Sequence, residues 1–159
     1  FTPYYDRLVE LRERIAHYDN YKMIGVLGGM AQQKFNQMLK VRPGNQVSFD
    51  KVGYDVKDLC HLLRVEEMLK NFSDDVSFKE NLGRFSTYGK IFLVGIKQFN
   101  VELLEAKKLA EEAMKKIEMY MQNYSQNHFH YVDNDVRVKV EDLLFDVIKE
   151  EVRKENLWN

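Results

Sequence analysis

The stretch from Asn100 to Tyr120 reads NVELLEAKKLAEEAMKKIEMY, and it indicates the fold class of the whole chain. Its apolar residues recur at alternating intervals of three and four, which is the spacing of an amphipathic α-helix. Asn100 is a favoured capping residue, and Glu102 and Glu105 place negative charge in the first two turns, where the helix dipole favours it. The spacing predicts a helix capped by Asn100, whose small alanines allow a neighbouring helix to approach closely.

Helical spacing continues on both sides of this stretch. The chain has only two prolines and eight glycines, so few residues interrupt a helix. Gly25, Gly28 and Gly29 nevertheless lie within one helical pattern, and they predict close packing at that point. The further helices that we predict cover about 3–17, 20–40, 55–70, 87–97 and 134–155.

The segments between these helices are predicted as loops. Residues 42–54 form a turn and a loop, and residues 71–81 form a polar connection with a short extended piece around Val76 and Phe78. Val136, Val138 and Val140 alternate as in a strand, but the spacing that follows them is helical. The sequence therefore predicts an all-α fold, a bundle of five to six helices in a single domain over residues 1–159.

Composition limits the classes of function. Of the 159 residues 45% are hydrophobic and 31% charged, and the net charge is −1, so any anion site must be local rather than the result of a general positive field. Cys60 is the single cysteine, which excludes an internal disulfide and favours a reducing, cytoplasmic location. No apolar run is long enough to span a membrane, and we expect no membrane partner.

A second informative stretch runs from Gly53 to Arg64 and reads GYDVKDLCHLLR. In a helix, Lys57, His61 and Arg64 stand at i, i+4 and i+7, within roughly 60° of one another at about 100° per residue. The leucines of the stretch fall on other faces. A row of basic side chains on one face is suited to hold a phosphate group. The alternative from the residues alone is a solvated basic face without a ligand.

The same stretch resembles a segment of predicted nucleotidyltransferases of the DNA polymerase β superfamily, in the helical part that follows their catalytic domain. That segment has the pattern Gly-Tyr-x-x-Lys-x-x-x-His-Leu-x-Arg. Here Gly53, Tyr54, Lys57, His61 and Arg64 occupy its positions, with two leucines between the last two. A looser likeness extends over about residues 21–123.

The resemblance implies a catalytic domain upstream of this chain. Family members carry a Gly-Ser turn and then an Asp-x-Asp pair, whose carboxylates bind two divalent metals. This chain has no Gly-Ser dipeptide, and we interpret Asp133-Asn134-Asp135 as a helix cap. Because the chain begins with Phe1 rather than Met, we expect it to be the C-terminal part of a longer nucleotidyltransferase-like protein, not catalytic alone.

The resemblance also implies a nucleotide site. Lys57 and Arg64 are expected to contact triphosphate oxygens, and His61 to donate a hydrogen bond or orient a neighbour. Tyr54 is expected either to stack on a base or to staple its loop to the bundle. Mg²⁺ and a nucleoside triphosphate would belong to the full-length parent. Its upstream catalytic domain is an expected partner, and nucleic acid is one expected acceptor.

Two other functions stay open from the sequence. One is a stand-alone helical interaction module, and the other is a ribonuclease, because Arg12 and His17 resemble the Arg-x4-His motif of HEPN domains. There the histidine would act as general acid or base and the arginine would stabilise the phosphorane. His128 and His130 lack partners at metal-ligand spacing, so we predict an aromatic loop and no metal site. Cys60 is interpreted as a small core residue.

Overall fold

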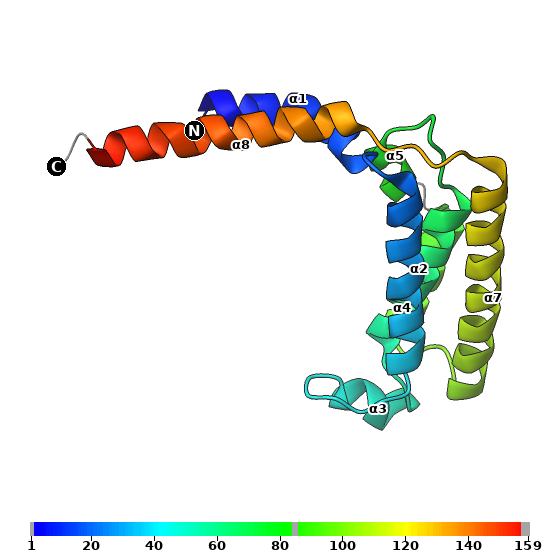
Figure 1. Ribbon diagram of the computed structural model, residues 1–159. Helices are drawn as coiled ribbons and strands as arrows, with labels where there is room; N and C mark the ends of the chain where they lie inside the picture. The colour runs from blue at the N-terminus through cyan, green and yellow to red at the C-terminus, as the bar shows by residue number, and fades with distance from the viewer. Residues whose placement is uncertain (1, 84–85, 157–159) are drawn as a thin grey trace. The chain divides into compact units, whose positions relative to one another are not determined.

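The structure is a computed structural model that describes residues 2–83 and 86–156, and every regular element in these ranges is an α-helix (Figure 1). The predicted all-α class is confirmed. Six of the helices correspond to those expected from the sequence, and two short ones are additional. The helices are α1 (Thr2–Ala16), α2 (Asn20–Gln37), α3 (Gln46–Val52), α4 (Val56–Lys70), α5 (Phe78–Gly83), α6 (Thr87–Lys97), α7 (Leu103–Asn127) and α8 (Asn134–Asn156).

The chain forms two compact units. The first, which we call the hairpin unit, combines residues 1–20 with 130–159 and contains α1 and α8. The second, the core unit, covers residues 21–129 and contains almost all of α2 together with α3 to α7. Whether both belong to one domain, as the sequence predicts, stays a prediction.

In the hairpin unit, α1 and α8 run antiparallel beside each other (Figure 1). Val136 and Leu143 of α8 are buried between them. The Arg14 guanidinium donates to both carboxylate oxygens of Asp133, at 2.8 and 2.7 Å, and to Asp135 at 2.8 Å. Asp133 Oδ1 also accepts from the Val136 amide at 3.1 Å, which is the predicted capping role. The alternating valines belong to a helix and not to a strand.

In the core unit, α4 and α7 form the largest helix–helix contact. Ala106, Ala110 and Ala113 of α7 are buried, so the predicted close approach at the alanines is confirmed. The prediction for the glycines of α2 holds only at Gly28, where an added Cβ would collide with the Met121 sulfur of α7. An added Cβ at either of the other two glycines would meet nothing within 4 Å.

The start of α7 corrects one prediction. The N-cap position is Glu102, not Asn100, and its side chain makes no capping hydrogen bond. Asn100 instead takes part in the capping of the C-terminus of α6. Its amide donates to the Gly95 carbonyl at 3.1 Å, and the Phe99 amide donates to the Ile96 carbonyl at 3.0 Å. These two bonds form a Schellman motif. Phe99, with φ of 65°, occupies the left-handed position that glycine normally takes.

The short helix α3 lies where the sequence predicts a loop. Gly53 ends it in a left-handed conformation, with φ of 77°, and its amide donates to the Phe49 carbonyl. The Ser48 hydroxyl joins α3 to α4, because it donates to the Tyr54 carbonyl at 2.6 Å and accepts from the Val56 amide at 3.0 Å. Side-chain bonds to the following turn therefore hold this seven-residue helix.

The short helix α5 replaces the extended piece predicted around Phe78. Ser77 and Glu80 form a capping box at its start: the Ser77 hydroxyl accepts from the Glu80 amide at 3.2 Å, and the Glu80 carboxylate accepts from the Ser77 amide at 3.1 Å. Asn81 closes the preceding loop through two bonds to the backbone of Ser73. The hydrogen bonds of the capping box and of Asn81 therefore favour a helix here, against the weak alternation of apolar residues that predicted an extended piece.

Candidate functional site

The basic row of α4 is positioned by the start of that helix. The Asp55 side chain caps α4 by accepting from the amides of Lys57, at 2.9 Å, and Asp58, at 3.2 Å. Leu59 and Leu62 are fully buried and fix the inner face of the helix. The row of Lys57, His61 and Arg64 lies on another face, as their spacing predicts.

A network of ion pairs behind this row holds the helix start in place. Arg42 donates to Asp55 at 2.9 Å and also to Asp58, while Lys34 Nζ lies 3.0 Å from Asp58 Oδ1. Asn45 Nδ2 donates to Asp55 at 2.9 Å. Burial raises the pKa of Asp55, but the bonds from Asn45, the two backbone amides and Arg42 outweigh it, and the net pKa is lowered.

A groove of about 580 Å³ opens between α4 and α6. Each helix contributes residues at i, i+3, i+4 and i+7, with a lysine at the first position and a lysine or arginine at the last. Apolar side chains and Cys60 lie between the basic ends. The lining residues are Val56, Lys57, Cys60, His61 and Arg64 of α4, and Lys90, Leu93, Val94 and Lys97 of α6.

The groove is strongly positive. Lys57, Lys90 and Lys97 are exposed, and within the described part of the chain none of them forms an ion pair. No carboxylate is found among the described residues that line the groove. Four permanent cations around one concave surface create a local positive potential, although the net charge of the chain is −1. Such a surface favours an anion that carries several charges.

His61 lies between the cations and is half-buried. Burial lowers its pKa below the usual value, and the nearby charges of Lys34, Lys57 and Arg64 lower it further, against a smaller opposite effect of Asp58. The imidazole is therefore mainly neutral at pH 7 and offers one N–H donor. An anion in the groove would offset the repulsion and raise this pKa.

Cys60 forms part of the groove floor. The residue is 1% exposed, and its thiol lies 3.7 Å from the Leu93 carbonyl of α6. Burial raises the pKa of the thiol, against the opposite effects of Lys97 and Arg64. These observations confirm the interpretation of Cys60 as a small core residue.

Tyr54 is not among the residues that line the groove. Its side chain is fully buried, and its hydroxyl donates to the Val101 carbonyl at 3.1 Å. Burial raises the pKa of this hydroxyl to about 12, with smaller contributions from Cys60 and Glu105. A fully enclosed ring has no free face for a base. Of the two roles expected for Tyr54, the geometry therefore gives the structural one, in which the ring staples its loop to the bundle.

The two lysines of α6 were not predicted as site residues. The signal is visible in KIFLVGIK, residues 90–97, where Lys90 and Lys97 are seven residues apart with Leu93 and Val94 between them. This is the spacing of Lys57, Cys60, His61 and Arg64 repeated in a second helix. Its meaning depends on which face of α6 meets α4, and the sequence of α6 alone does not determine this.

The other residues that the sequence suggested for a site do not line this groove. Arg12 is exposed on α1 and lies 4.0 Å from Glu13, whereas His17 follows the end of α1 with its Nδ1 3.0 Å from Asn20 Oδ1. His128 stacks on the Tyr124 ring at 4.1 Å. His130 Nε2 lies 3.1 Å from Asp19 Oδ1 in the hairpin unit. Within residues 2–83 and 86–156, no three His, Cys, Asp or Glu side chains gather as a metal site would require.

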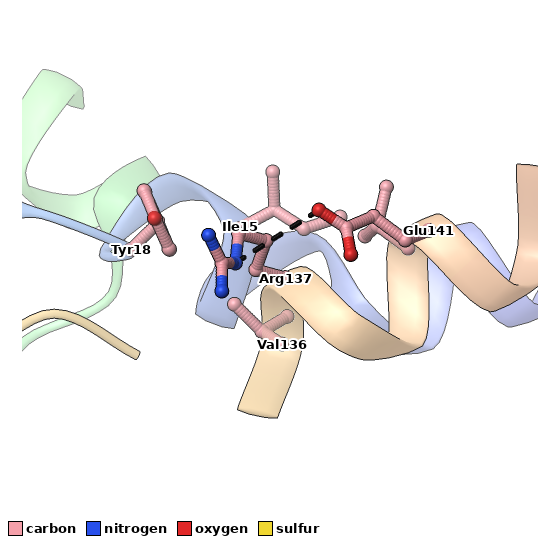
Figure 2. Close-up of a pocket in the computed structure, with 6 residues that line it drawn as sticks. Ile15, Tyr18, Val136, Arg137 and Glu141 are labelled. Atoms are coloured by element: carbon pink, nitrogen blue, oxygen red, sulfur yellow. Dashed lines mark ion pairs between the residues drawn. The ribbon is translucent and has the colours of Figure 1, made fainter. Parts of the chain in front are cut away.

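A second cavity, of about 350 Å³, lies in the hairpin unit between the end of α1 and the start of α8. Arg137 and Glu141 flank it (Figure 2), and they form an ion pair in which Arg137 Nε lies 3.9 Å from Glu141 Oε1. Ile15 and Val136 provide apolar walls. The single cation is already paired, so this cavity has less to offer an anion than the groove between α4 and α6.

Comparisons of the chain with protein-family models, with curated proteins and with solved structures found no match. The resemblance to nucleotidyltransferases therefore rests on the residues of the chain itself. None of the helices in the described ranges has both the length and the apolar content of a membrane span.

Proposed function

We propose that this chain is a helical accessory domain of a nucleotidyltransferase-like protein, and that the groove between α4 and α6 binds the phosphates of a nucleotide. The observation that carries the proposal is the paired arrangement of basic residues. Lys57 and Arg64 of α4 face the same groove as Lys90 and Lys97 of α6. Arginine and lysine together supply directional and point-charge contacts to phosphate oxygens.

The size of the groove supports a nucleotide as the ligand. Small-molecule sites commonly have volumes of about 300–1,000 Å³, and this groove has about 580 Å³. Leu93 and Val94 offer an apolar surface beside the cations. His61 adds a donor within the row, and burial together with the neighbouring cations lowers its pKa.

Catalysis is assigned to a different part of the parent protein. The described residues that line the groove include no carboxylate, so they do not fit the ligand set of Mg²⁺. Asp133 and Asp135 are engaged by Arg14, and Asp133 caps α8. The metal and the transfer step therefore belong to the upstream catalytic domain that the resemblance implies. The acceptor, with nucleic acid as one candidate, belongs there as well.

The test is an NMR titration of the chain with Mg²⁺–ATP. We expect shift changes at Lys57, His61 and Arg64, and also at Lys90 and Lys97, with weakened binding in Lys57→Ala/Arg64→Ala. A matched control is Lys115→Ala/Arg153→Ala, which removes the same charges from exposed positions on α7 and α8.

Two readouts separate phosphate binding from a general charge effect. The control variant should bind as the unmodified chain does, and the pKa of His61 should rise when ATP is present. Equal weakening in both double variants, or no shift changes at millimolar ATP, would contradict a phosphate site on this chain.

A further inference from the structure

Helix α8 carries apolar residues on two opposite faces. The first face packs on α1 and includes the buried Val136 and Leu143. The second face points away from α1, because at about 100° per residue its members lie on the far side of the helix. Its members and their exposed fractions are Val138 at 47%, Phe145 at 66%, Ile148 at 62% and Val152 at 49%.

The second face, which we call the α8 seam, has the spacing of a helix-pairing surface. Val138, Phe145 and Val152 repeat every seven residues, and Ile148 lies between the last two, three residues after Phe145 and four before Val152. This is the a/d pattern by which one helix packs along another. The four residues extend over about 21 Å at about 1.5 Å per residue. Between Val138 and Val152, Glu141 is the one charged residue at a d position.

We infer that the α8 seam binds the same seam of a second copy of this chain, with the two helices antiparallel. In this arrangement Phe145 packs against Ile148 of the second copy, and the reciprocal contact forms by symmetry. Glu141 lies beside Val152 of the second copy. A parallel arrangement would instead place the two copies of Glu141 against each other within the seam, and like charges there disfavour it.

Charges beside the seam select the antiparallel arrangement. Asp142 and Lys149 stand seven residues apart on one edge of the seam. When Phe145 meets Ile148 of the second copy, Asp142 lies beside Lys149 of that copy, and the pair forms twice. Both side chains belong to exposed residues, and neither forms an ion pair with another residue in the described ranges. The edge is thus complementary to itself only when the helices run in opposite directions.

The resulting assembly is a four-helix arrangement. The two α8 helices form its centre, and each α1 covers the face of its own α8 that holds Val136 and Leu143. Two helices alone enclose little apolar surface, and pairing of hairpins is a common way to complete such a core. The α8 seam belongs to the hairpin unit and shares no residue with the groove of the core unit.

A charge-swap experiment tests the pairing. The association of the chain, Asp142→Lys and Lys149→Asp is measured by sedimentation over a range of concentrations. The unmodified chain is expected to dimerise. Each variant alone places like charges at both positions and is expected to dimerise at least tenfold more weakly. An equimolar mixture of the two variants restores both opposite-charge pairs and is expected to form heterodimers.

Glu10→Lys is the matched control, because it makes the same charge change at an exposed position of α1. It should dimerise as the unmodified chain does, and far-UV circular dichroism should show all variants folded. A monomeric unmodified chain at high concentration would overturn the inference. So would variants that dimerise normally alone, or a mixture that does not associate.

Discussion

The ion-pair network behind α4 yields a quantitative prediction for Arg42→Ala. The guanidinium donates to Gln37 at 2.8 Å and to Asp55 at 2.9 Å, and it also contacts Asp58. The side chains of Asp55 and Asp58 are only 8% and 4% exposed. Removal of the arginine therefore leaves two nearly buried carboxylates with fewer partners.

The size of the effect follows from the partners that remain. Breaking a buried ion pair by removal of one partner costs about 3–5 kcal/mol. Here Asp58 keeps Lys34 at 3.0 Å, Asp55 keeps Asn45 at 2.9 Å and two backbone amides, and water reaches Arg42, which is 35% exposed. We therefore expect the free energy of unfolding to fall by about 2–3 kcal/mol, at the lower end of or below the range for fully buried pairs.

Urea unfolding followed by circular dichroism measures this loss. With a urea dependence of about 1–3 kcal/mol per molar, the midpoint should fall by roughly 0.7–3 M. The control is Lys70→Ala on the same helix, whose pair with Glu67 is long, at 3.9 Å, and half exposed, so it should cost only about 0.2–0.5 kcal/mol. Arg42→Lys keeps the charge but loses the forked donation, so its loss of unfolding free energy should lie between those of Arg42→Ala and Lys70→Ala. Equal effects of Arg42→Ala and Lys70→Ala would refute the role assigned to the network.

Two further predictions concern the same unit. The folded pKa of Asp55 is lowered, so its stabilisation is present above the unfolded value of about 3.9 and is lost as the pH falls through the folded value. Urea midpoints should drop on acidification below about pH 4, and this drop should be smaller in Asn45→Ala, because loss of the Asn45 bond brings the folded pKa of Asp55 closer to the unfolded value. Gly29→Ala should raise the free energy of unfolding by about 0.5–1 kcal/mol, since its Cβ meets open space. Gly28→Ala should gain less, because Met121 must rotate away; an equal gain in thermal unfolding would contradict the close contact.

The helices that could be predicted are those whose apolar faces repeat over several turns. In α4 and α7 the spacing of the apolar residues predicts the position of the helix, because burial of one face stabilises each helix. The short helices α3 and α5 offer too few turns for a period. Their stability comes from particular side-chain bonds, such as those of Ser48 to the following turn and the reciprocal bonds of Ser77 and Glu80.

The candidate site was predictable in one helix and not in the other. Lys57, His61 and Arg64 share a face because the geometry of a single helix requires it. Lys90 and Lys97 face them only because α6 packs on α4, which is a tertiary contact. The burial of Tyr54 has the same origin, since its hydrogen bond reaches Val101, 47 residues later in the chain.

Because Cys60 lies where α6 packs on α4, the reactivity of its thiol reports how far these two helices separate. It is the single cysteine, it is 1% exposed, and its thiol contacts the Leu93 carbonyl of α6. Burial against α6 shields the thiol and raises its pKa, so we expect a thiol reagent to react with it when α6 moves away from α4. The rate of alkylation measures how often the groove opens, without any introduced label, and a bound ligand that bridges the two helices would slow it.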